Sequence, residues 1–516
     1  MHPAKRQILI FTVIAAAIME LIDISIVNVA LSHMSGNLGS TLADTSWVVT
    51  SYAIANVIVI PMSSFLSVSL GRRTYYIGSV ILFTICSFMC GNASNIWVLV
   101  FFRFLQGLGG GALLSVSQAI MFELFPREKQ GIASALFGLG VFIGPTIGPT
   151  LGGFITEHYS WPWIFYINIP VGIAVTISCF FLLQEATIQQ TIKKTDWVGI
   201  LLLIIGVSTL QTVLERGQEE DWFDTTYITV FTVMAILSLI AFIIWELRVS
   251  DPVVNLRVFR SRTLTVAAIL TFITGIGMFT SVYLTPVFAQ RLLYFTPVET
   301  GLLLLPGSFF ALLSLIISGK LLQRGLSPVV MIILGYGLFI YFSWTMSRMS
   351  LDVSAELISR QLIYRAVGIA LLTVPLTMLA VSSLEAKDIP QGAALNNMMR
   401  QLGGSFGIAM VNTYTARRAA AHRSDLVSYL NPDNPEVAGR LHQYTQYFQQ
   451  HGAAVDHARQ QAIGLMEYGV SRQSNLLSYL DAYAMIGFLF LICLPLLLMV
   501  RRKSSATLAM QQIQDH

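Results

Sequence analysis

Apolar residues recur along the chain in long runs that are separated by short polar segments. There are about fourteen runs, and each is long enough for an α-helix that crosses a bilayer. Their predicted limits are 8–31, 46–68, 75–93, 96–122, 131–155, 163–183, 196–214, 226–247, 263–289, 298–320, 328–347, 359–382, 392–414 and 478–500. The pattern predicts an all-α polytopic membrane protein, and the even number of spans predicts that both termini lie on one side of the membrane.

The composition agrees with this interpretation. Only 11% of the 516 residues are charged, whereas a soluble domain carries about 25% charged residues. If the N-terminus is cytoplasmic, eighteen Lys and Arg residues lie in the inside segments and three lie in the short outside loops. The positive-inside rule therefore predicts cytoplasmic termini. The four cysteines lie within apolar runs, at spacings that fit neither a metal site nor a disulfide framework. Nothing in the net charge indicates a nucleic-acid partner.

Two carboxylates, Glu20 and Asp23, lie in the middle of the first apolar run. They are three residues apart and therefore share a helix face. A charge near the bilayer centre costs at least ~2.5–3.5 kcal/mol, so such a residue is a functional candidate. If the two side chains are close, they titrate as a coupled pair. We interpret them as a place where a proton is taken up and released. The alternative is that they only satisfy polar neighbours beside a water-filled vestibule, and for Glu20 both interpretations stay open.

The fourth run carries Arg103 and Gln106, followed by a glycine-rich segment. A guanidinium this deep in the membrane needs an acceptor, and Asp23 or Glu20 is the obvious partner. Arginine does not deprotonate in practice, so Arg103 is expected to act as a fixed charge. Gln106 lies three residues further along and shares its helix face. This pattern predicts a buried polar cluster between the first and fourth helices.

The fifth run carries glycines at every fourth position, which makes one smooth helix face. These glycines are Gly140, Gly144, Gly148 and Gly152, and two prolines, Pro145 and Pro149, lie among them. Proline removes a backbone donor and bends a helix. A smooth, bent face suits two helix bundles that rock against each other. Static tight packing would also use the glycines, but it explains the paired prolines less well.

Other polar residues are candidates for a substrate cavity or for conformational control. The cavity candidates are Asn28, Gln106, Tyr283, Asn397 and Arg400. Tyrosine is also common at membrane interfaces, which is the favoured alternative for Tyr283. Arg400 could equally form a bond between helices. Gly71, Arg72 and Arg73 form a loop motif after the second run, where arginines can reach headgroups or a neighbouring helix end.

Several of these motifs together resemble a known family. The segment Asp23-x-Ser25-Ile26-Val27-Asn28 resembles the first-helix signature of fourteen-span drug:proton antiporters of the major facilitator superfamily, the EmrB/QacA group. Arg103-x-x-Gln106-Gly107 and the glycine–proline segment 140–153 are similar to the fourth- and fifth-helix motifs of that superfamily. The segment 214–217 and the long last outside loop are most similar to EmrB-type inner-membrane pumps. The loop motif departs from the family, because Ser64 and Val68 replace the usual glycine and acid.

The resemblance implies a major facilitator fold, with two six-helix bundles around a cavity and an extra helix pair between them. We place the N-terminal bundle at 1–184, the helix pair at 185–250 and the C-terminal bundle at 251–516. It further implies drug export driven by proton entry, with Asp23 as the coupling acid and Arg103 as its partner. EmrB-type pumps work with a periplasmic adaptor and an outer-membrane channel, which would give the loop at about 415–477 a partner.

Two other functions are alternatives to export. A nutrient or metabolite symporter or facilitator would use the same fold, so the fold alone does not separate it from an exporter. A membrane enzyme is not expected, because the sequence holds no histidine cluster, nucleophile constellation or phosphate-binding loop. We expect neither a cofactor nor a metal site.

Overall fold

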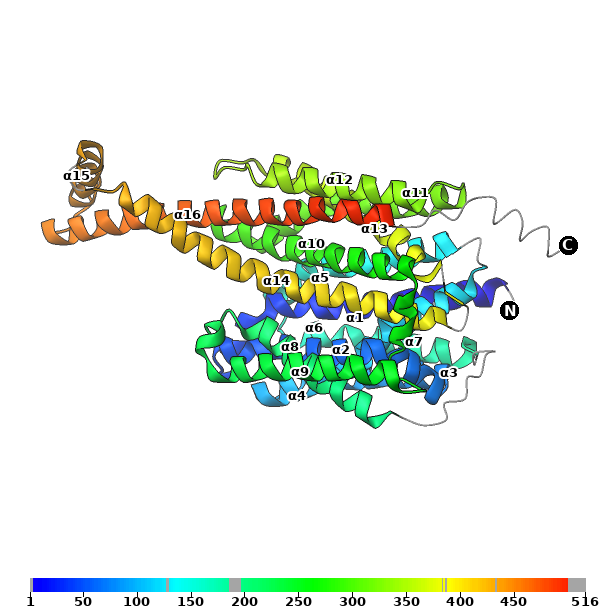
Figure 1. The fold of residues 1–516 in the computed structure, drawn as a ribbon. Helices are drawn as coiled ribbons and strands as arrows, with labels where there is room; N and C mark the ends of the chain where they lie inside the picture. The colour runs from blue at the N-terminus through cyan, green and yellow to red at the C-terminus, as the bar shows by residue number, and fades with distance from the viewer. Residues whose placement is uncertain are drawn as a thin grey trace.

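The computed structural model consists of helices packed side by side, with α14, α15 and α16 extending beyond the bundle at one end (Figure 1). The structure describes residues 3–126, 130–184, 196–382, 384–385, 388–431 and 434–499. In Figure 1, α1 begins and α16 ends towards the same end of the bundle, opposite to the extension. We call these two ends the terminal end and the extension end.

The first half of the chain forms one bundle. Its helices are α1 (Pro3–Leu38), α2 (Leu42–Ser69), α3 (Arg72–Gly91), α4 (Ile96–Leu124), α5 (Gln130–His158), and the short α6 (Trp163–Tyr166), which continues into α7 (Asn168–Leu182). Helix α1 packs against α4, α5 and α7, and α4 also packs against α2 and α3. The predicted sixth span is therefore two helices in series. All the other predicted spans of this half correspond to single helices.

The second half forms the other bundle. Its helices are α10 (Arg262–Leu292), α11 (Pro297–Gln323), α12 (Pro328–Met346), α13 (Ala355–Ser382), α14 (Ile389–Ser428) and α16 (Val455–Cys493), which ends in the 3₁₀ turn η5 (Leu494–Met499). The short α15 (Pro435–Gln450) lies on the extension. Within the bundle, α13 packs against α11 and α12, and α14 packs against α10 and α16.

A helix pair connects the two bundles. It consists of α8 (Trp197–Arg216) and α9 (Thr226–Arg248), with the 3₁₀ turns η2 (Trp222–Asp224) between them and η3 (Leu256–Arg260) after them. Helix α8 contacts α2 of the first bundle and α14 of the second. The residue limits 1–184, 185–250 and 251–516 stay a prediction.

Polar residues that cap helix ends explain where several helices begin. The Thr41 side chain accepts a hydrogen bond from the Asp44 amide at the start of α2, and the Asn95 side chain accepts one from Val98 at the start of α4. Thr296 and Glu299 form a reciprocal capping box at α11. Such caps satisfy amides that have no partner within the helix. They mark the short loops that separate the apolar runs.

By length and composition, twelve helices among the described residues could cross a membrane. Helices α5 and α14 are not among these twelve, although both are long and pack within the bundles. The predicted run 392–414 forms the first part of α14, which continues to Ser428, and the predicted run 478–500 is preceded by helix from Val455. The long loop expected at 415–477 is thus largely helical, as its flanking pieces suggested. Pro432 and Asp433 of its predicted break lie outside the described residues.

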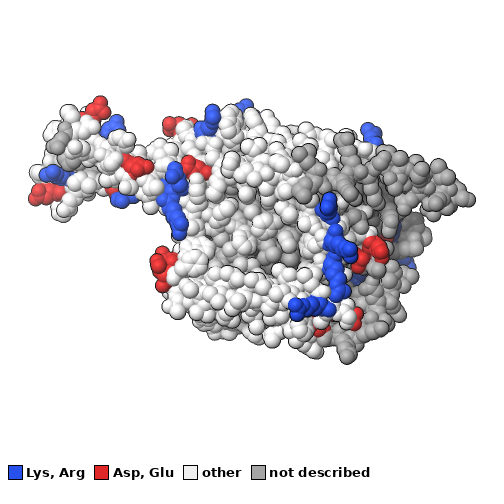
Figure 2. Space-filling view, in the orientation of Figure 1, with Lys and Arg blue, Asp and Glu red and all other residues white. Residues whose placement is uncertain are grey.

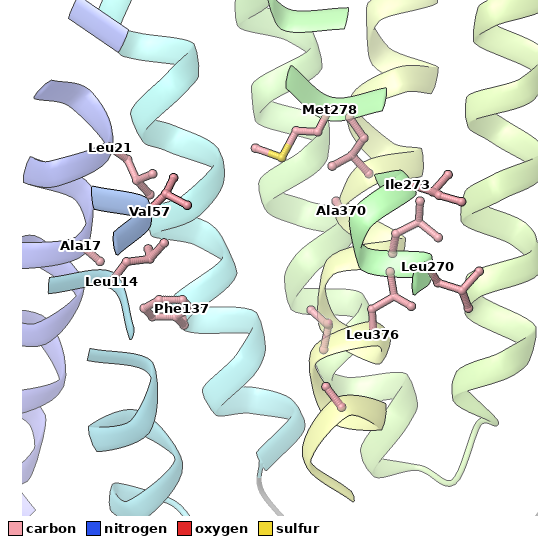
Figure 3. Packing of buried hydrophobic residues seen from close by; sticks show 14 of the residues in the cluster. Ala17, Leu21, Val57, Leu114, Phe137, Leu270, Ile273, Met278, Ala370 and Leu376 are labelled. Carbon is pink, nitrogen blue, oxygen red and sulfur yellow. The ribbon is translucent and has the colours of Figure 1, made fainter. Parts of the chain in front are cut away.

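Buried apolar side chains fill both bundles and the contact between them. Figure 3 shows Ala17, Leu21, Val57, Leu114 and Phe137 on helices of the first half, facing one another, and Leu270, Ile273, Met278, Ala370 and Leu376 on α10 and α13 of the second. The halves meet where α5 packs against α11 and α13, and where α14 packs against α2 and α4. Helix α5 therefore lies between α1 of its own bundle and α11 of the other bundle.

Candidate functional site

A complete buried ion pair joins α1 to α4. Asp23 is 0% exposed and Arg103 is 1% exposed. Arg103 Nη1 donates a hydrogen bond to Asp23 Oδ2 at 2.5 Å. The other carboxylate oxygen, Oδ1, accepts from Gln106 Nε2 at 3.0 Å and from Asn168 Nδ2 at 2.8 Å. Both oxygens accept hydrogen bonds, so residues of two helices, α4 and α7, hold the carboxylate of α1.

Several other groups hold the Arg103 guanidinium. Its Nη1 also donates to Gln106 Oε1 at 2.9 Å, and its Nε donates to the Val48 carbonyl at 3.3 Å. The guanidinium carbon lies 4.1 Å from the ring centroid of Tyr52, in cation–π geometry. A buried ion pair is stable only when hydrogen bonds satisfy its remaining donors and acceptors. Loss of either partner would leave an uncompensated charge among apolar helices.

Glu20 lies one helical turn from Asp23 in a different environment. It is 0% exposed, and its Oε1 accepts a hydrogen bond from Asn56 Nδ2 at 2.8 Å. Its Oε2 has no hydrogen-bond partner among the described residues, and no ion pair there involves Glu20. The cluster therefore holds two unlike carboxyl groups, one paired with arginine and one bonded to an amide.

Tyr52 and Asn56 connect the surroundings of the two acids. They are four residues apart on α2 and face α4, where Gly110 leaves space for them. A Cβ atom added at Gly110 would overlap the Tyr52 hydroxyl and would lie 3.4 Å from Asn56 Nδ2. The Tyr52 ring thus covers Arg103 while its hydroxyl lies near Asn56. Position 110 of α4 therefore requires glycine, because the Tyr52 hydroxyl occupies the space that a Cβ atom would need.

The glycine face of α5 packs against α1, the helix that carries both acids. Cβ atoms added at Gly140, Gly144, Gly148 and Gly152 would meet Ile18, Leu21, Ser25 and Ile26 in turn. The Ser25 hydroxyl also donates to the Gly144 carbonyl at 3.2 Å. The opposite side of α5 meets α11, where a Cβ added at Gly301 would lie 3.0 Å from Thr150 Cγ2. Pro149 is partly buried, and the Pro145 side chain lies outside the described part of the structure.

The loop motif after α2 is bonded to α4 and to the end of α7. Gly71 has φ +80°, which favours glycine, and precedes the first residue of α3. Arg72 forms an ion pair with Glu123 of α4, and Arg73 Nη2 donates to the Phe180 carbonyl of α7 at 2.6 Å. Glu123 thus supplies a carboxylate near the motif in which Val68 replaces the family's acid.

The residues predicted for a substrate cavity lie in different surroundings. Gln106 belongs to the Asp23 cluster, whereas Asn28 is exposed and Tyr283 is 38% exposed. Asn397 is buried, and its Nδ2 donates to Gln118 Oε1 at 2.7 Å, which links α14 to α4 of the other half. Arg400 is 8% exposed, and its Nη1 has no hydrogen-bond partner among the described residues. Among the residues that the structure describes, no hydrogen bond joins any two of these five candidates.

Comparison with known proteins agrees with this architecture. The family model described as "Major Facilitator Superfamily" matches residues 13–408. The chain is similar to "Multidrug export protein EmrB" of Escherichia coli K12, with 32% identity over 497 residues that cover 96% of this chain and 95% of the relative. It is also similar to "Fatty acid resistance protein FarB" of Neisseria gonorrhoeae, with 30% identity over 93% of each chain.

A solved structure supports the fold independently. The crystal structure of the human organic anion transporter MFSD10 (TETRAN) superposes with a TM-score of 0.61, covering 96% of this chain and 100% of that chain, at 11% sequence identity. At that identity, the likeness concerns the fold alone. The family match, the relatives and the fold agree with one another, and none of them describes an enzyme. The chain is a multi-pass membrane transporter that belongs to the major facilitator superfamily and, within it, to the EmrB-type group.

Proposed function

We propose that this transporter exports amphipathic compounds from the cytoplasm in exchange for protons that enter through the α1–α4 cluster. Two relatives that match nearly the whole chain carry the names multidrug export protein and fatty acid resistance protein. The observation that carries the proposal is the buried Asp23–Arg103 pair, whose acid lies on α1, the helix that packs against the glycine face of α5. An ionisable residue inside a membrane bundle marks a proton or substrate path by default.

Protonation of Asp23 would change the balance of charge in the cluster. The neutral acid holds Arg103 less strongly, while Arg103 keeps its charge. Gln106 Oε1 already accepts from Arg103 Nη1 and can retain it. Helix α1 would then be held less firmly to α4. For protons to drive export, protonation of Asp23 must change the free energies of the outward and inward conformations by different amounts. A proton that moves down a membrane potential of 100 mV supplies ~2.3 kcal/mol.

We assign Glu20 a second protonation role. It is buried, with a single hydrogen bond from Asn56 and no cation paired to it among the described residues. Burial of an ionised carboxylate without a counter-charge costs more free energy than burial of the neutral acid. In this scheme Glu20 holds a proton while Asp23 is ionised. The groups that face Glu20 are Asp23 on its own helix and Tyr52 and Asn56 on α2.

The proposed orientation places the terminal end in the cytoplasm and the extension end in the periplasm, with the bundles in the inner membrane. It rests on the distribution of Lys and Arg. The extension built from α14, α15 and α16 would then project into the periplasm, and α15 has no buried residue. Its exposed surface is available for a periplasmic adaptor protein that leads to an outer-membrane channel.

The test uses inside-out membrane vesicles with an established proton gradient. Candidate amphipathic drugs are added, and the gradient is followed for wild type, Asp23→Asn and Glu20→Gln. The control is Glu356→Gln, which removes an exposed acid at the start of α13. We expect drugs to dissipate the gradient with wild type and the control but not with Asp23→Asn.

Each other outcome removes part of the proposal. If Asp23→Asn behaves like wild type, Asp23 does not couple protons to export. If Glu20→Gln behaves like wild type, the second protonation role is wrong. If no drug in a broad panel affects the gradient of folded, inserted wild-type protein, the export proposal is overturned and a nutrient carrier becomes the better explanation.

A further inference from the structure

An open groove with room for one acyl chain lies where α9 meets α8, the two helices of the connecting pair. Its volume is about 440 Å³, and its lining is almost wholly apolar apart from one arginine. The lining residues are Leu202, Ala241, Ile244, Trp245, Arg248 and Val249. Many other side chains of α9 are exposed and apolar, for example Leu237, which is 62% exposed. A surface of this kind faces lipid in a membrane protein.

The wall formed by Trp245 is fixed by the start of α8. The Trp245 indole Nε1 donates to Asp196 Oδ1 at 2.8 Å, and the same oxygen accepts from the Gly199 amide at 2.9 Å, which caps α8. Asp196 thus joins the first turn of α8 to the last turns of α9. These hydrogen bonds hold the ring of Trp245 in place as one wall of the groove.

Positive charge gathers at the end of the groove. Arg248 lies in the last turn of α9, where the candidate membrane span also ends, and its side chain is exposed. Arg257 Nη2 donates to the carbonyls of Leu247 and Val249, which flank Arg248, at 3.2 and 2.8 Å. This bond ties a second guanidinium to the same helix end.

The surrounding segment extends this positive patch. Residues 248–262 also include Arg260 and Arg262, both exposed, and one acid, Asp251, so the segment has a net charge of +3. Figure 2 shows a column of Lys and Arg side chains across this end of the visible face, over the connection from α9 to α10. An apolar groove that ends in arginines at the membrane surface matches the two parts of an anionic lipid.

We propose that the groove between α8 and α9 binds one anionic phospholipid, with an acyl chain along the groove and the phosphate bound by Arg248 and Arg257. Guanidinium groups bind phosphate through paired hydrogen bonds. Basic pockets between transmembrane helices are known as sites for anionic headgroups. The bound lipid connects α8, which touches both bundles, to the membrane. This inference does not depend on the proposed transport reaction.

The full-length protein is purified in detergent, incubated with equal amounts of phosphatidylglycerol and phosphatidylcholine, and examined by native mass spectrometry. We expect wild type to retain phosphatidylglycerol in preference. Arg248→Gln should lower the retained phosphatidylglycerol about fivefold, the effect of one cation at the surface. Ala241→Trp fills the groove and should lower the retention of both lipids. The matched control is Arg324→Gln, which removes an exposed arginine that follows α11.

The proposal is overturned if wild type retains the two lipids equally, since the site would then lack a headgroup preference. It is also overturned if Arg324→Gln loses as much phosphatidylglycerol as Arg248→Gln, because the effect would then reflect surface charge in general. If Arg248→Gln does not fold, Ala241→Trp still tests whether a lipid occupies the groove. If Ala241→Trp retains lipid as wild type does, no acyl chain lies in the groove.

Discussion

Replacement of Gly148 by alanine tests whether the glycine face of α5 controls the position of the acid-bearing helix. The new Cβ would overlap the Ser25 hydroxyl, lie 2.9 Å from Ser25 Cβ and lie 3.3 Å from the Ile22 carbonyl oxygen. A change of rotamer moves the Ser25 hydroxyl but not its Cβ, so α1 must move away from α5. Asp23 lies between Ile22 and Ser25 and moves with them. Its hydrogen bond from Gln106, at 3.0 Å, would change in length.

The magnitude follows from the overlap. Overpacking of a well-packed interface costs about 1–3 kcal/mol. If only one of the two conformations is destabilised by this amount, the equilibrium between them shifts about 5- to 150-fold. We expect Gly148→Ala to lower the melting temperature in detergent. We also expect it to slow drug-driven proton movement in vesicles by a factor in that range.

Two variants make this prediction specific. Gly337→Ala is the control, because a Cβ at this α12 glycine would meet nothing within 4 Å. Ser25→Gly removes both the hydroxyl and the Cβ that obstruct the alanine. The double variant Gly148→Ala/Ser25→Gly should therefore recover most of the activity that Gly148→Ala loses, relative to Ser25→Gly alone. The reasoning is refuted if Gly148→Ala behaves like Gly337→Ala, or if the double variant is no better than Gly148→Ala.

Three further substitutions each remove one interaction, and the three interactions differ in their expected strength. Arg103→Lys keeps the charge but loses the planar fork that reaches Gln106 and the α2 carbonyl, so we expect a clear fall in melting temperature and loss of proton coupling in vesicles. Gln118→Leu leaves the buried amide of Asn397 without its acceptor, at a cost of about 1–3 kcal/mol. It should speed labelling of a cysteine placed between the two halves, and an unchanged rate would contradict this. Glu123→Gln breaks an ion pair that is half exposed on the glutamate side, which contributes about 0–1 kcal/mol. It should leave the melting temperature unchanged.

The sequence predicts the number and type of helices well because each span must be long and apolar to cross a bilayer. It predicts their ends less well. Helix α14 continues to Ser428 through the segment 416–421, which consists of alanine and arginine. Both residues favour helix, so nothing in the chain stops the helix where the apolar run ends. Helix α16 likewise begins at Val455, well before the predicted apolar run at 478–500.

The acid cluster was only partly predictable. The rule that a buried guanidinium needs a counter-charge gave Asp23 or Glu20 as the partner of Arg103, and the structure pairs Asp23. Which of the two acids pairs with Arg103 depends on how α1 and α4 are positioned relative to each other along their axes. No local sequence pattern encodes that position. Tyr52 and Asn56 were not identified, although a polar pair four residues apart in an apolar run shares one helix face. Asn168 was not given a role, because its partner, Asp23, lies 145 residues away in the sequence.

The two halves of the chain contact each other near the terminal end of the bundle. Near the terminal end, Phe122 and Ala133 of the first half form a small buried cluster with Val381 and Ala393 of the second. The Gln118–Asn397 hydrogen bond lies nearby, four residues from Phe122 and from Ala393 on its two helices. The halves are thus in contact at this end, which is the cytoplasmic end in the proposed orientation.

Opening at this end would require that hydrogen bond and that small cluster to separate. A buried hydrogen bond that loses its partner costs about 1–3 kcal/mol. A proton crossing 100 mV supplies ~2.3 kcal/mol. The two energies are comparable, so in the proposed mechanism one protonation event at the α1–α4 cluster supplies energy of the size needed to break this hydrogen bond, with α5 as the connecting helix. Helix α5 contacts the acid-bearing helix on one side and α11 of the other half on the other. A closure held by a larger apolar interface could not be biased by a single proton.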